Sequence, residues 1–416
     1  MKPRIHYYSD CPFFAGCENM LTLFLNDIQF RTSFDIGFSY RDTIPYREGL
    51  SKRVKDSGKY SPVRLFDHYD LYNYIDKTCS PHVRKPMKIL VNLVLVKYAF
   101  MVINTVLLYS HFSRSEIDLV HINNGGYPGA YSTISAVFAA RLAGIRRIVY
   151  VINNIPVGYH PPERWLDYPF DRVLVHLVSQ FVTGSDFTRK MAIQILNIPS
   201  DNIMFIHNGI VPPAVTETRS QVVSRLGFAE PSFILTVIAN LEERKGHIHL
   251  FKALQYMKDT HPELALPLCI IEGTGPLEQQ LKKDVQDMHL TGHVIFIGRE
   301  EHIFNLMNAS DCILLPSIRD EDLPNVILEA MSLGKPIIAS NLAGIPEEID
   351  ANSGVLTTPG DHRELAEGVM RLMSDESLRR TLGKNAQNRF FNHFTHEKAL
   401  RLYGSLYAGL LKDVTS

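Results

Sequence analysis

The sequence is poor in the features that mark several classes of protein. Its five cysteines are odd in number and form no CxxC pair, so we expect reduced thiols and neither disulfides nor a metal cluster. A formal net charge of −1 over 416 residues gives no overall attraction to nucleic acid, which is not an expected partner. No internal repeat or low-complexity stretch occurs, which argues against a repeat architecture.

Long apolar runs are absent as well. Residues 1–8 lack the apolar core and small-residue cleavage site of a signal peptide, so we expect none. Residues 88–110 are rich in Leu, Val and Ile, but Asn92, Lys97 and Asn104 interrupt them. A spanning helix needs about 20 predominantly apolar residues, so a buried or partner-facing helix is the better prediction. We expect a cytoplasmic protein.

Basic residues lie before and at the start of that apolar segment. Beside an apolar helix they could bind an anionic bilayer surface, which would place the protein peripherally at the inner face of a membrane. A solvated helix face explains them equally well, so both alternatives stay open. The residues are Lys77, His82, Arg84, Lys85 and Lys88.

What the chain does have is two halves of alternating strand and helix patterns. Its 45% hydrophobic and 21% charged residues are typical of a soluble globular protein, and its length predicts two or three domains. Strand–helix alternation indicates parallel sheets with helices on both faces. We therefore predict two Rossmann-like, doubly wound α/β domains facing a central cleft, residues 1–211 and 212–394, and an amphipathic helix over residues 395–416.

Apolar runs bounded by turn signals predict the strands, and apolar spacings of three to four predict the helices. Residues 210–221 have no such period and contain two prolines, so they are predicted as the linker. The expected strands are residues 4–9, 117–122, 147–152, 181–183 and 203–207, then 233–239, 266–271, 294–297, 311–315 and 336–340. The expected helices are residues 17–27, 133–142, 247–257, 277–288 and 325–333.

Glu321 and Glu329 lie in the most informative stretch, residues 317–336. A predicted strand precedes this stretch, and residues 325–333 form a predicted helix. Glu321 therefore comes before the helix and Glu329 about one turn inside it. Ligands of open α/β sheets bind beyond the carboxyl ends of the strands, so these carboxylates are a candidate binding site.

Lys245 follows the first predicted strand of the second half and precedes a predicted helix. A lysine beside the positive end of a helix suits a phosphate group, and an ordinary solvated lysine is the alternative. Gly16 marks a point where the backbone could approach a ligand closely, or only a turn. The glycine turn at residues 272–276 has the same two interpretations.

Together these segments resemble the family-four (group 1) retaining glycosyltransferases, which have the two-domain GT-B fold. The resemblance is strongest over about residues 181–403 and looser in the N-terminal half, which in the family carries the acceptor site. The matching motifs are Val-Thr-Gly-Ser at 182–185, His-Asn-Gly at 207–209, Lys-Gly at 245–246, Glu-Gly-Thr-Gly-Pro-Leu at 272–277, Asn-Ala-Ser-Asp at 308–311, the two-glutamate stretch and Gly-Ile-Pro-Glu at 344–347.

The resemblance implies that these residues bind a nucleoside diphosphate sugar donor. Lys245 is similar to the lysine that neutralises the leaving diphosphate, and Glu321 to the glutamate that holds hydroxyls of the donor sugar; these two are the implied catalytic residues. Glu329 is similar to the glutamate that binds the ribose. The other implied donor contacts are Gly16 near the diphosphate, Arg299 near the base, and the backbone N–H groups of Leu323, Asn325 and Val326.

Two positions depart from the family pattern. Family members commonly have a second phosphate-binding arginine at the position of Asn240. Many relatives have Asn-Leu there instead, so we still expect activity. Without that arginine, Lys245 and Arg244 would neutralise more of the phosphate charge. Where a histidine often faces the reacting sugar, the residue is Asn153, which can hydrogen-bond but cannot act as an acid or base. His121 is a second candidate for a sugar or acceptor contact, with ordinary packing as the alternative.

The implied reaction moves a hexose-type sugar from the donor to a hydroxyl of a glycan or lipid-linked acceptor, in cell-surface polysaccharide or glycolipid synthesis, with the anomeric configuration retained. No metal or other cofactor is expected, and the final helix would cross back onto the N-terminal domain. A nucleoside-diphosphate-sugar epimerase or hydrolase on the same fold remains an alternative, as does a non-catalytic protein that binds nucleotide sugars or glycans.

Overall fold

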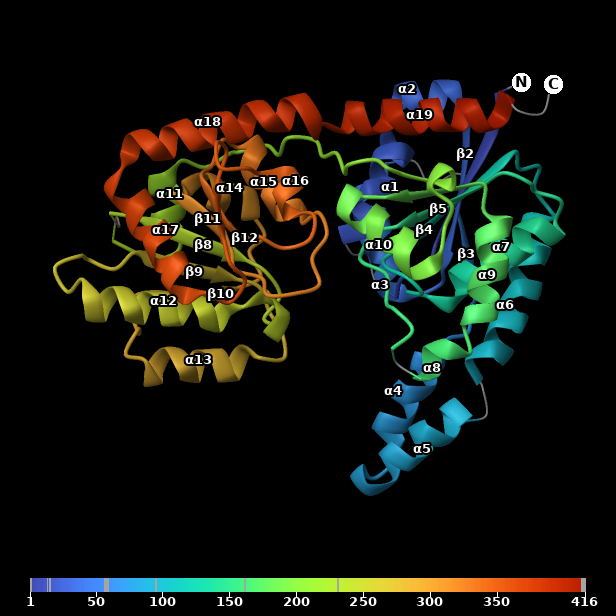
Figure 1. Cartoon of the computed structure of the whole chain (residues 1–416), viewed down its shortest axis with the longest axis horizontal. Helices are drawn as coiled ribbons and strands as arrows, with labels where there is room; N and C mark the ends of the chain where they lie inside the picture. Colours follow the sequence, from blue (N-terminus) through green and yellow to red (C-terminus); the bar gives the residue numbers. More distant parts are fainter. Residues whose placement is uncertain are drawn as a thin grey trace. The chain divides into compact units, whose positions relative to one another are not determined.

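The chain folds as two compact units (Figure 1). The computed structural model describes residues 2–12, 14, 16–55, 60–93, 96–160, 162–229 and 232–412. Unit 1 comprises Met1–Ile206 and Leu400–Ser416, and unit 2 comprises His207–Ala399. Each unit contains one parallel β-sheet packed against helices, so the predicted α/β class is confirmed.

Unit 1 is built on a seven-stranded parallel sheet with the order β3-β2-β1-β4-β5-β6-β7. Ile5 of β1 pairs with Ile36 of β2 on one side and with Leu119 of β4 on the other. The central strands are buried almost throughout, because helices cover both faces of a parallel sheet. The strands are β1 (Arg4–Ser9), β2 (Asp35–Arg41), β3 (Tyr60–Val63), β4 (Leu119–Asn124), β5 (Ile148–Ile152), β6 (Gln180–Thr183) and β7 (Ile203–Phe205).

Alternate residues of these strands enter two separate hydrophobic cores. Tyr8, Val120 and Tyr150 pack in one core with residues of α6, α7 and α9. Tyr7 and Leu119 pack in the other with residues of α1, α2 and α19. The helices of unit 1 are α1 (Gly16–Asn26), α2 (Ile28–Ser33), α3 (Ile44–Arg53), α4 (His68–Thr78), α5 (Pro81–Leu93), α6 (Val96–Phe112), α7 (Tyr131–Leu142), α8 (Pro162–Trp165), α9 (Tyr168–Leu177), α10 (Asp186–Leu196), the 3₁₀ turn η1 (Ser200–Asn202) and the end of α19 (His396–Lys412).

Unit 2 is built on a six-stranded parallel sheet with the order β10-β9-β8-β11-β12-β13. Leu235 of β8 pairs with Cys269 of β9 and Cys312 of β11, and both cysteines are buried free thiols. The strands are β8 (Ile234–Ile238), β9 (Leu268–Glu272), β10 (Val294–Gly298), β11 (Cys312–Leu315), β12 (Ile337–Ser340) and β13 (Val355–Thr357).

Side-chain caps mark the start of several helices in unit 2. Thr218 and Gln221 form a capping box at α11, while Asp361 caps α17 and Asp375 caps α18. The helices are α11 (Arg219–Arg225), the 3₁₀ turn η2 (Glu243–Lys245), α12 (His247–Thr260), α13 (Glu278–Asp287), α14 (Ile303–Ala309), α15 (Asn325–Ser332), α16 (Ile345–Glu348), α17 (His362–Ser374) and α18 (Glu376–His393).

The structure differs from the sequence prediction in several places. Residues 88–110, predicted as one helix, belong to two helices, α5 and α6. The predicted linker, residues 210–221, is too long, because the capping box starts α11 at Arg219. The strands β2, β3 and β13 have no counterpart in the prediction.

The last helix, α19, begins in unit 2 and from Leu400 on belongs to unit 1. Tyr403 and Tyr407 are buried there, and Arg147 Nε donates a 2.8 Å hydrogen bond to the Leu410 carbonyl. In the part of the chain that the structure describes, no helix has the length and apolar character needed to cross a membrane.

Candidate active site

Three predicted donor residues of unit 2 follow the carboxyl ends of neighbouring strands: Arg299 follows β10, Lys245 follows β8 and Glu321 follows β11. Glu272, which was not among the predicted donor residues, ends β9 between β10 and β8. Carboxyl ends of parallel strands meet at one edge of a sheet. The fold therefore gathers these side chains, which are far apart in the sequence, at a single edge.

Gly246 lets the Lys245 turn lie against the chain that leaves β11. Gly246 has a φ of 70°, and an added Cβ would lie 2.0 Å from the Pro316 carbonyl oxygen. The two segments are joined by a 2.8 Å hydrogen bond from Ile318 N–H to the Arg244 carbonyl. A larger residue at Gly246 would therefore separate Lys245 from the Glu321 loop.

Glu321 is held by three side chains. Ser317 Oγ donates a 2.7 Å hydrogen bond to Glu321 Oε1, Lys245 Nζ donates to the same oxygen, and Arg244 Nη1 lies 3.5 Å from it. The side chains of Lys245 and Glu321 are only 12% and 7% exposed. Both charges are thus largely removed from water, and each is compensated chiefly by the other.

The start of α15 adds backbone donors next to Glu321. Asn325 is the first residue of this helix and Val326 the second. The first N–H groups of an α-helix have no intrahelical acceptor and carry partial positive charge. Leu323 precedes them and is buried. This end of α15 can therefore bind an anion or a hydroxyl oxygen through its backbone.

Glu329 is the fifth residue of α15 and shares this edge with Glu272. Burial, and then the negative charge of Glu272, raise the pKa of Glu329 to about 7. Burial also raises the pKa of Glu272, although the Glu300 N–H at 3.1 Å and the charge of Arg299 oppose that change. Burial and the charge of Glu272 thus both oppose ionisation of Glu329, whose pKa lies at about 7.

Arg244, which is expected to share the phosphate charge with Lys245, makes several contacts at this edge. Arg244 donates to Glu242 at 2.9 Å and to the Asp320 carbonyl at 3.1 Å, besides its contact with Glu321. Asn240 is exposed, and its carbonyl accepts a 2.9 Å hydrogen bond from Glu242 N–H.

Several polar contacts of this region were not predicted from the sequence. Ser317 supports Glu321, as described, and His207 Nε2 lies 3.1 Å from Glu347 Oε2, which joins the His-Asn-Gly and Gly-Ile-Pro-Glu motifs. Glu348 is fully buried, and within the described residues its carboxyl oxygens have no hydrogen-bond partner. Burial, with the negative charge of Asp322, raises its pKa well above the usual value.

The carboxyl edge of the unit 1 sheet also carries polar side chains. Asp10, directly after β1, contacts Arg41 at 3.3 Å and accepts a hydrogen bond from Ser132. Burial raises the pKa of Asp10, and Arg41 opposes that rise. Asn153, directly after β5, donates to Asn123 Oδ1 at 2.8 Å. Gly16 is the first residue of α1, which follows β1.

His121 lies in the hydrophobic core of unit 1 and not at this edge. Its side chain is buried, its Nδ1 lies 2.6 Å from the Tyr407 hydroxyl, and its ring packs on Tyr7 with centroids 4.8 Å apart. Burial lowers its pKa to about 3. The predicted contact of His121 with sugar or acceptor is therefore not supported, and the packing alternative accounts for it.

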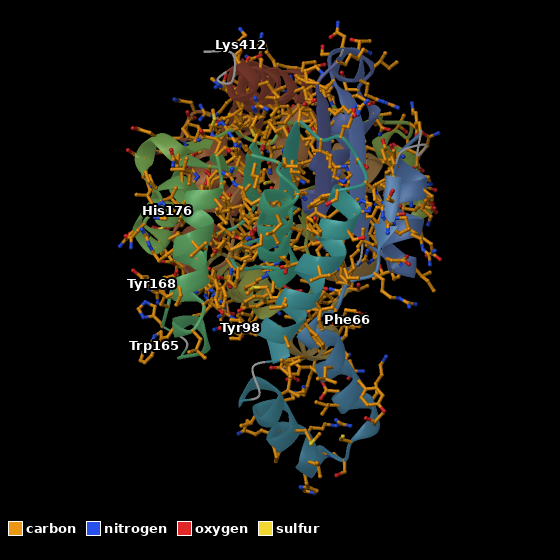
Figure 2. The ribbon with its side chains drawn as sticks, turned by 90° about the vertical axis from the view of Figure 1, so that its right-hand side faces the viewer. Phe66, Tyr98, Trp165, Tyr168, His176 and Lys412 are labelled. Atoms are coloured by element: carbon orange, nitrogen blue, oxygen red, sulfur yellow. The ribbon has the colours of Figure 1, made fainter. Side chains whose placement is uncertain are left out.

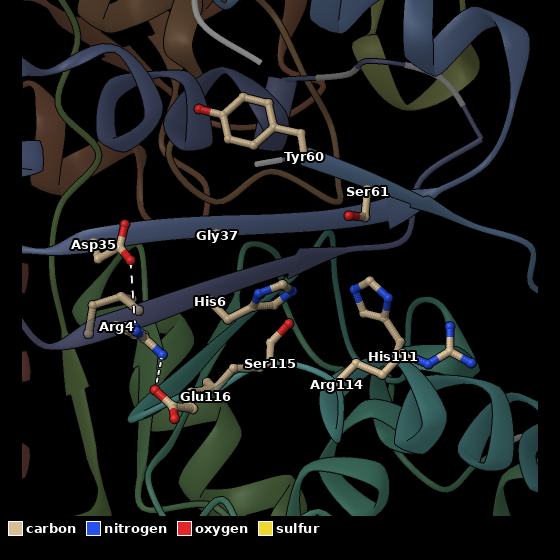
Figure 3. A pocket seen from close by; sticks show the side chains of 12 residues that line it. Arg4, His6, Asp35, Gly37, Tyr60, Ser61, His111, Arg114, Ser115 and Glu116 are labelled. Atoms are coloured by element: carbon tan, nitrogen blue, oxygen red, sulfur yellow. Dashed lines mark hydrogen bonds and ion pairs between the residues drawn. The ribbon is translucent and has the colours of Figure 1, made fainter. Parts of the chain in front are cut away.

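A cavity lies at the opposite edge of the unit 1 sheet (Figure 3). It has a volume of about 640 Å³ and is lined by the first residues of β1, β2 and β3 and by the end of α6. His6 and His111 face each other across it, with ring centroids 5.7 Å apart. None of the predicted donor residues lines this cavity. No group of three or more potential metal ligands occurs among the described residues.

Comparison with known proteins identifies the family. A family model described as glycosyl transferases group 1 matches residues 219–389, and one described as glycosyltransferase family 4 matches residues 76–212. N-acetyl-alpha-D-glucosaminyl L-malate synthase of Bacillus anthracis is 30% identical over 309 residues, which are 72% of this chain and 77% of that protein. The chain belongs to the group 1 glycosyltransferase family. This glycosyltransferase is accordingly a hexosyltransferase-type enzyme, as predicted.

Other relatives agree with this assignment. The glycosyltransferase is 26% identical over 325 residues to UDP-Gal:alpha-D-GlcNAc-diphosphoundecaprenol alpha-1,3-galactosyltransferase of Escherichia coli, covering 73% of this chain and 78% of that one. HepE of Anabaena, solved with UDP, has a TM-score of 0.72 at 20% identity, covering 98% of this chain and 100% of its own. A glycosyltransferase of Rickettsia africae gives 0.75 at 16% identity, with 99% of each chain covered. These likenesses confirm the GT-B fold.

Proposed function

We propose that the protein transfers a hexose from a nucleoside diphosphate sugar to an acceptor hydroxyl with retention of the anomeric configuration. The observation that carries this proposal is the cluster of Lys245, Glu321 and Ser317 beside the start of α15. A lysine, helix N–H groups and a carboxylate suit an anionic diphosphate and the hydroxyls of a sugar bound next to it. Retention is the family's usual outcome.

Each donor contact follows from the chemistry of its residue. Lys245, with Arg244 at its side, binds the diphosphate, while Glu321 accepts hydrogen bonds from sugar hydroxyls. The backbone of Leu323, Asn325 and Val326 binds sugar or phosphate oxygens. The remaining proposed donor contacts are Glu329 to the ribose, Arg299 and Asn240 near the nucleotide, and Gly16 near the diphosphate.

The chemistry rests on the leaving group. The bond between the anomeric carbon and the diphosphate oxygen breaks, and positive charge develops on the sugar ring. Lys245 and the helix N–H groups stabilise the departing nucleoside diphosphate. The acceptor oxygen bonds to the anomeric carbon on the face that the diphosphate leaves, and its proton passes to the diphosphate. No protein base is required, which agrees with an asparagine, Asn153, in place of a family histidine.

A glycan or lipid-linked acceptor is proposed for unit 1. The E. coli relative acts, by its name, on a sugar diphosphoundecaprenol, which supports a lipid-linked acceptor met at a membrane surface. Asn153 uses its amide nitrogen to bind Asn123, which leaves its amide oxygen to accept a hydrogen bond from a hydroxyl. Cell-surface polysaccharide or glycolipid synthesis is the process that such an activity serves.

The test is turnover with nucleoside diphosphate hexoses that raise the melting temperature of the protein. Lys245→Ala and Glu321→Ala should each lower turnover about 100- to 1000-fold without unfolding the chain. Lys252→Ala on α12 and Glu243→Ala in η2 are matched controls, because both side chains are exposed. Wild-type turnover in either site variant would refute the site.

The product decides between this proposal and its alternatives. NMR of the new glycosidic bond should show the donor's anomeric configuration, and an inverted anomer would refute the retaining mechanism. Free sugar or an epimer released from the donor alone, with no transfer product, would identify a hydrolase or epimerase. Donor binding without turnover of any donor would identify a binding protein.

A further inference from the structure

Helix α6 carries an uncovered apolar stripe along its length. Val102 and Val106 are 62% and 60% exposed, and Ile103 and Leu107 beside them are exposed as well. The spacing of three and four residues places these four side chains, here called the α6 stripe, on one face of the helix. Met101, Leu108 and Phe112 on the other face are buried in the core of unit 1. The core therefore accounts for one face of α6 and leaves the stripe unexplained.

Aromatic side chains extend this surface at the first end of α6. Phe66 is exposed and lies against Phe100 of α6, with ring centroids 5.7 Å apart. Trp165 of α8 is exposed too, and Asp167, two residues after it, accepts a 2.7 Å hydrogen bond from Tyr98 of α6. Figure 2 shows Phe66 and Trp165 on either side of Tyr98. Tryptophan and tyrosine beside apolar residues are typical of protein surfaces at the membrane–water interface.

The charged residues of α5 and α6 are all basic. No Asp or Glu occurs between Asp76 and Glu116, a stretch that includes all of α5 and α6. Lys77 and Lys85 are exposed on α4 and α5, and Arg114 is exposed beyond the other end of α6. Two other lysines of the stretch are already paired: Lys88 with Asp76 at 2.7 Å and Lys97 with Asp167 at 3.0 Å. Cations that are available for a partner thus flank the stripe at both ends.

We propose that the α6 stripe and the basic residues of α4 and α5 bind the surface of an anionic lipid bilayer. Apolar side chains enter the boundary between headgroups and acyl chains, while the lysines contact anionic headgroups. A second copy of this chain fits less well, because two surfaces in which basic residues outnumber acidic ones repel each other. Nucleic acid would leave the apolar stripe in water. This proposal depends on the proposed function in one respect only: membrane binding would bring unit 1 to the proposed lipid-linked acceptor.

The experiment is sedimentation of the full-length protein with vesicles of phosphatidylglycerol or of phosphatidylcholine. The wild-type protein should bind the anionic vesicles, and more weakly at high salt. Lys77→Glu and Lys85→Glu should each weaken binding by at least roughly fivefold, the equivalent of about 1 kcal/mol per basic residue. Val102→Glu with Val106→Glu should abolish binding. Ile28→Glu with Leu142→Glu is the matched control in unit 1, since these side chains are 80% and 66% exposed outside α4–α6.

The outcomes separate this inference from the proposed function. Vesicle binding needs neither donor nor acceptor, and the stripe variants should keep full turnover with a water-soluble acceptor. Equal binding of wild-type protein and stripe variants would overturn the inference, as would no binding to anionic vesicles. So would a dimer, seen by sedimentation velocity, that the stripe variants dissociate. A protein that binds vesicles through the stripe but transfers no sugar would instead refute the proposed function.

Discussion

Glu329→Gln should stabilise the protein at neutral and alkaline pH, because it removes a carboxylate whose ionisation the fold opposes. Burial, and then the charge of Glu272, raise the pKa of Glu329 from 4.5 to about 7. Between these values the native state holds a proton that the unfolded chain has released. The free energy of unfolding therefore falls as the pH rises through this window, and the fall ends above about pH 7.

The size of the effect follows from the change in pKa. A rise from 4.5 to about 7 corresponds to about 3 kcal/mol at 1.36 kcal/mol per unit. Partial exposure of Glu329 makes this an upper bound, because solvent screens the charge. In a unit of this size 1 kcal/mol moves the melting temperature by roughly 2–4 °C. The variant should therefore melt like the wild-type protein near pH 4.5 and at most roughly 6–12 °C higher near pH 8.

Thermal unfolding of both proteins, followed by circular dichroism from about pH 4.5 to pH 8, tests this. Glu367→Gln on α17 is the control, because Glu367 is exposed and its replacement should not change the pH dependence. Glu272→Gln should lower the pKa of Glu329, and the double variant should gain less than the sum of the single ones. A difference in melting temperature between Glu329→Gln and wild type that is the same at every pH would refute the reasoning.

Three further predictions follow from single contacts. Gly246→Ala should abolish transfer, because its Cβ would lie 2.0 Å from the Pro316 oxygen. Gly227→Ala is the control, because Gly227 has a similar φ of 79° but an added Cβ would have no heavy atom within 4 Å. Equal activity of the two variants would contradict the role of the Lys245 turn. Glu348→Gln should raise the urea midpoint of unfolding more at pH 8 than at pH 5. Burial raises the pKa of Glu348, so the free energy of unfolding of the wild-type protein falls as the pH rises. A change in midpoint that is the same at both pH values would contradict this prediction. Tyr407→Phe should lower the free energy of unfolding by about 1–3 kcal/mol, measured in urea, because it leaves buried His121 Nδ1 without its 2.6 Å partner; an unchanged midpoint would show that the contact adds nothing.

The sequence predicts the framework of the site well because strong local signals define it. The apolar run before Pro316 and the apolar spacing after Asn325 predict β11 and α15, which the structure confirms within two residues. Parallel strands then bring their carboxyl ends together whatever the side chains are. For this reason Lys245 and Glu321 could be expected at one edge before any contact between them was known.

The contacts that support the site were not predictable in the same way. Ser317 lies four residues before Glu321, but no local pattern shows that its hydroxyl turns toward that carboxylate. The direction of the His121 side chain could not be predicted from the local sequence either. His121 lies in β4 and alternates with neighbours that enter the other core, so its direction depends on the phase of the strand, which the sequence leaves open. Its partner, Tyr407, is 286 residues away.

The contact between Lys245 and Glu321 makes the proposed roles of these two residues interdependent. Each side chain is largely buried and compensates the charge of the other, so an arriving diphosphate draws Lys245 away from a carboxylate that still needs a donor. The hydroxyls of the sugar can supply that donor, along with Ser317 and Arg244. Binding of the phosphate is then more favourable when the sugar binds with it as part of one donor molecule. The same argument explains why free nucleoside diphosphate should bind less favourably than the nucleotide sugar, since it takes the lysine and leaves Glu321 less well compensated.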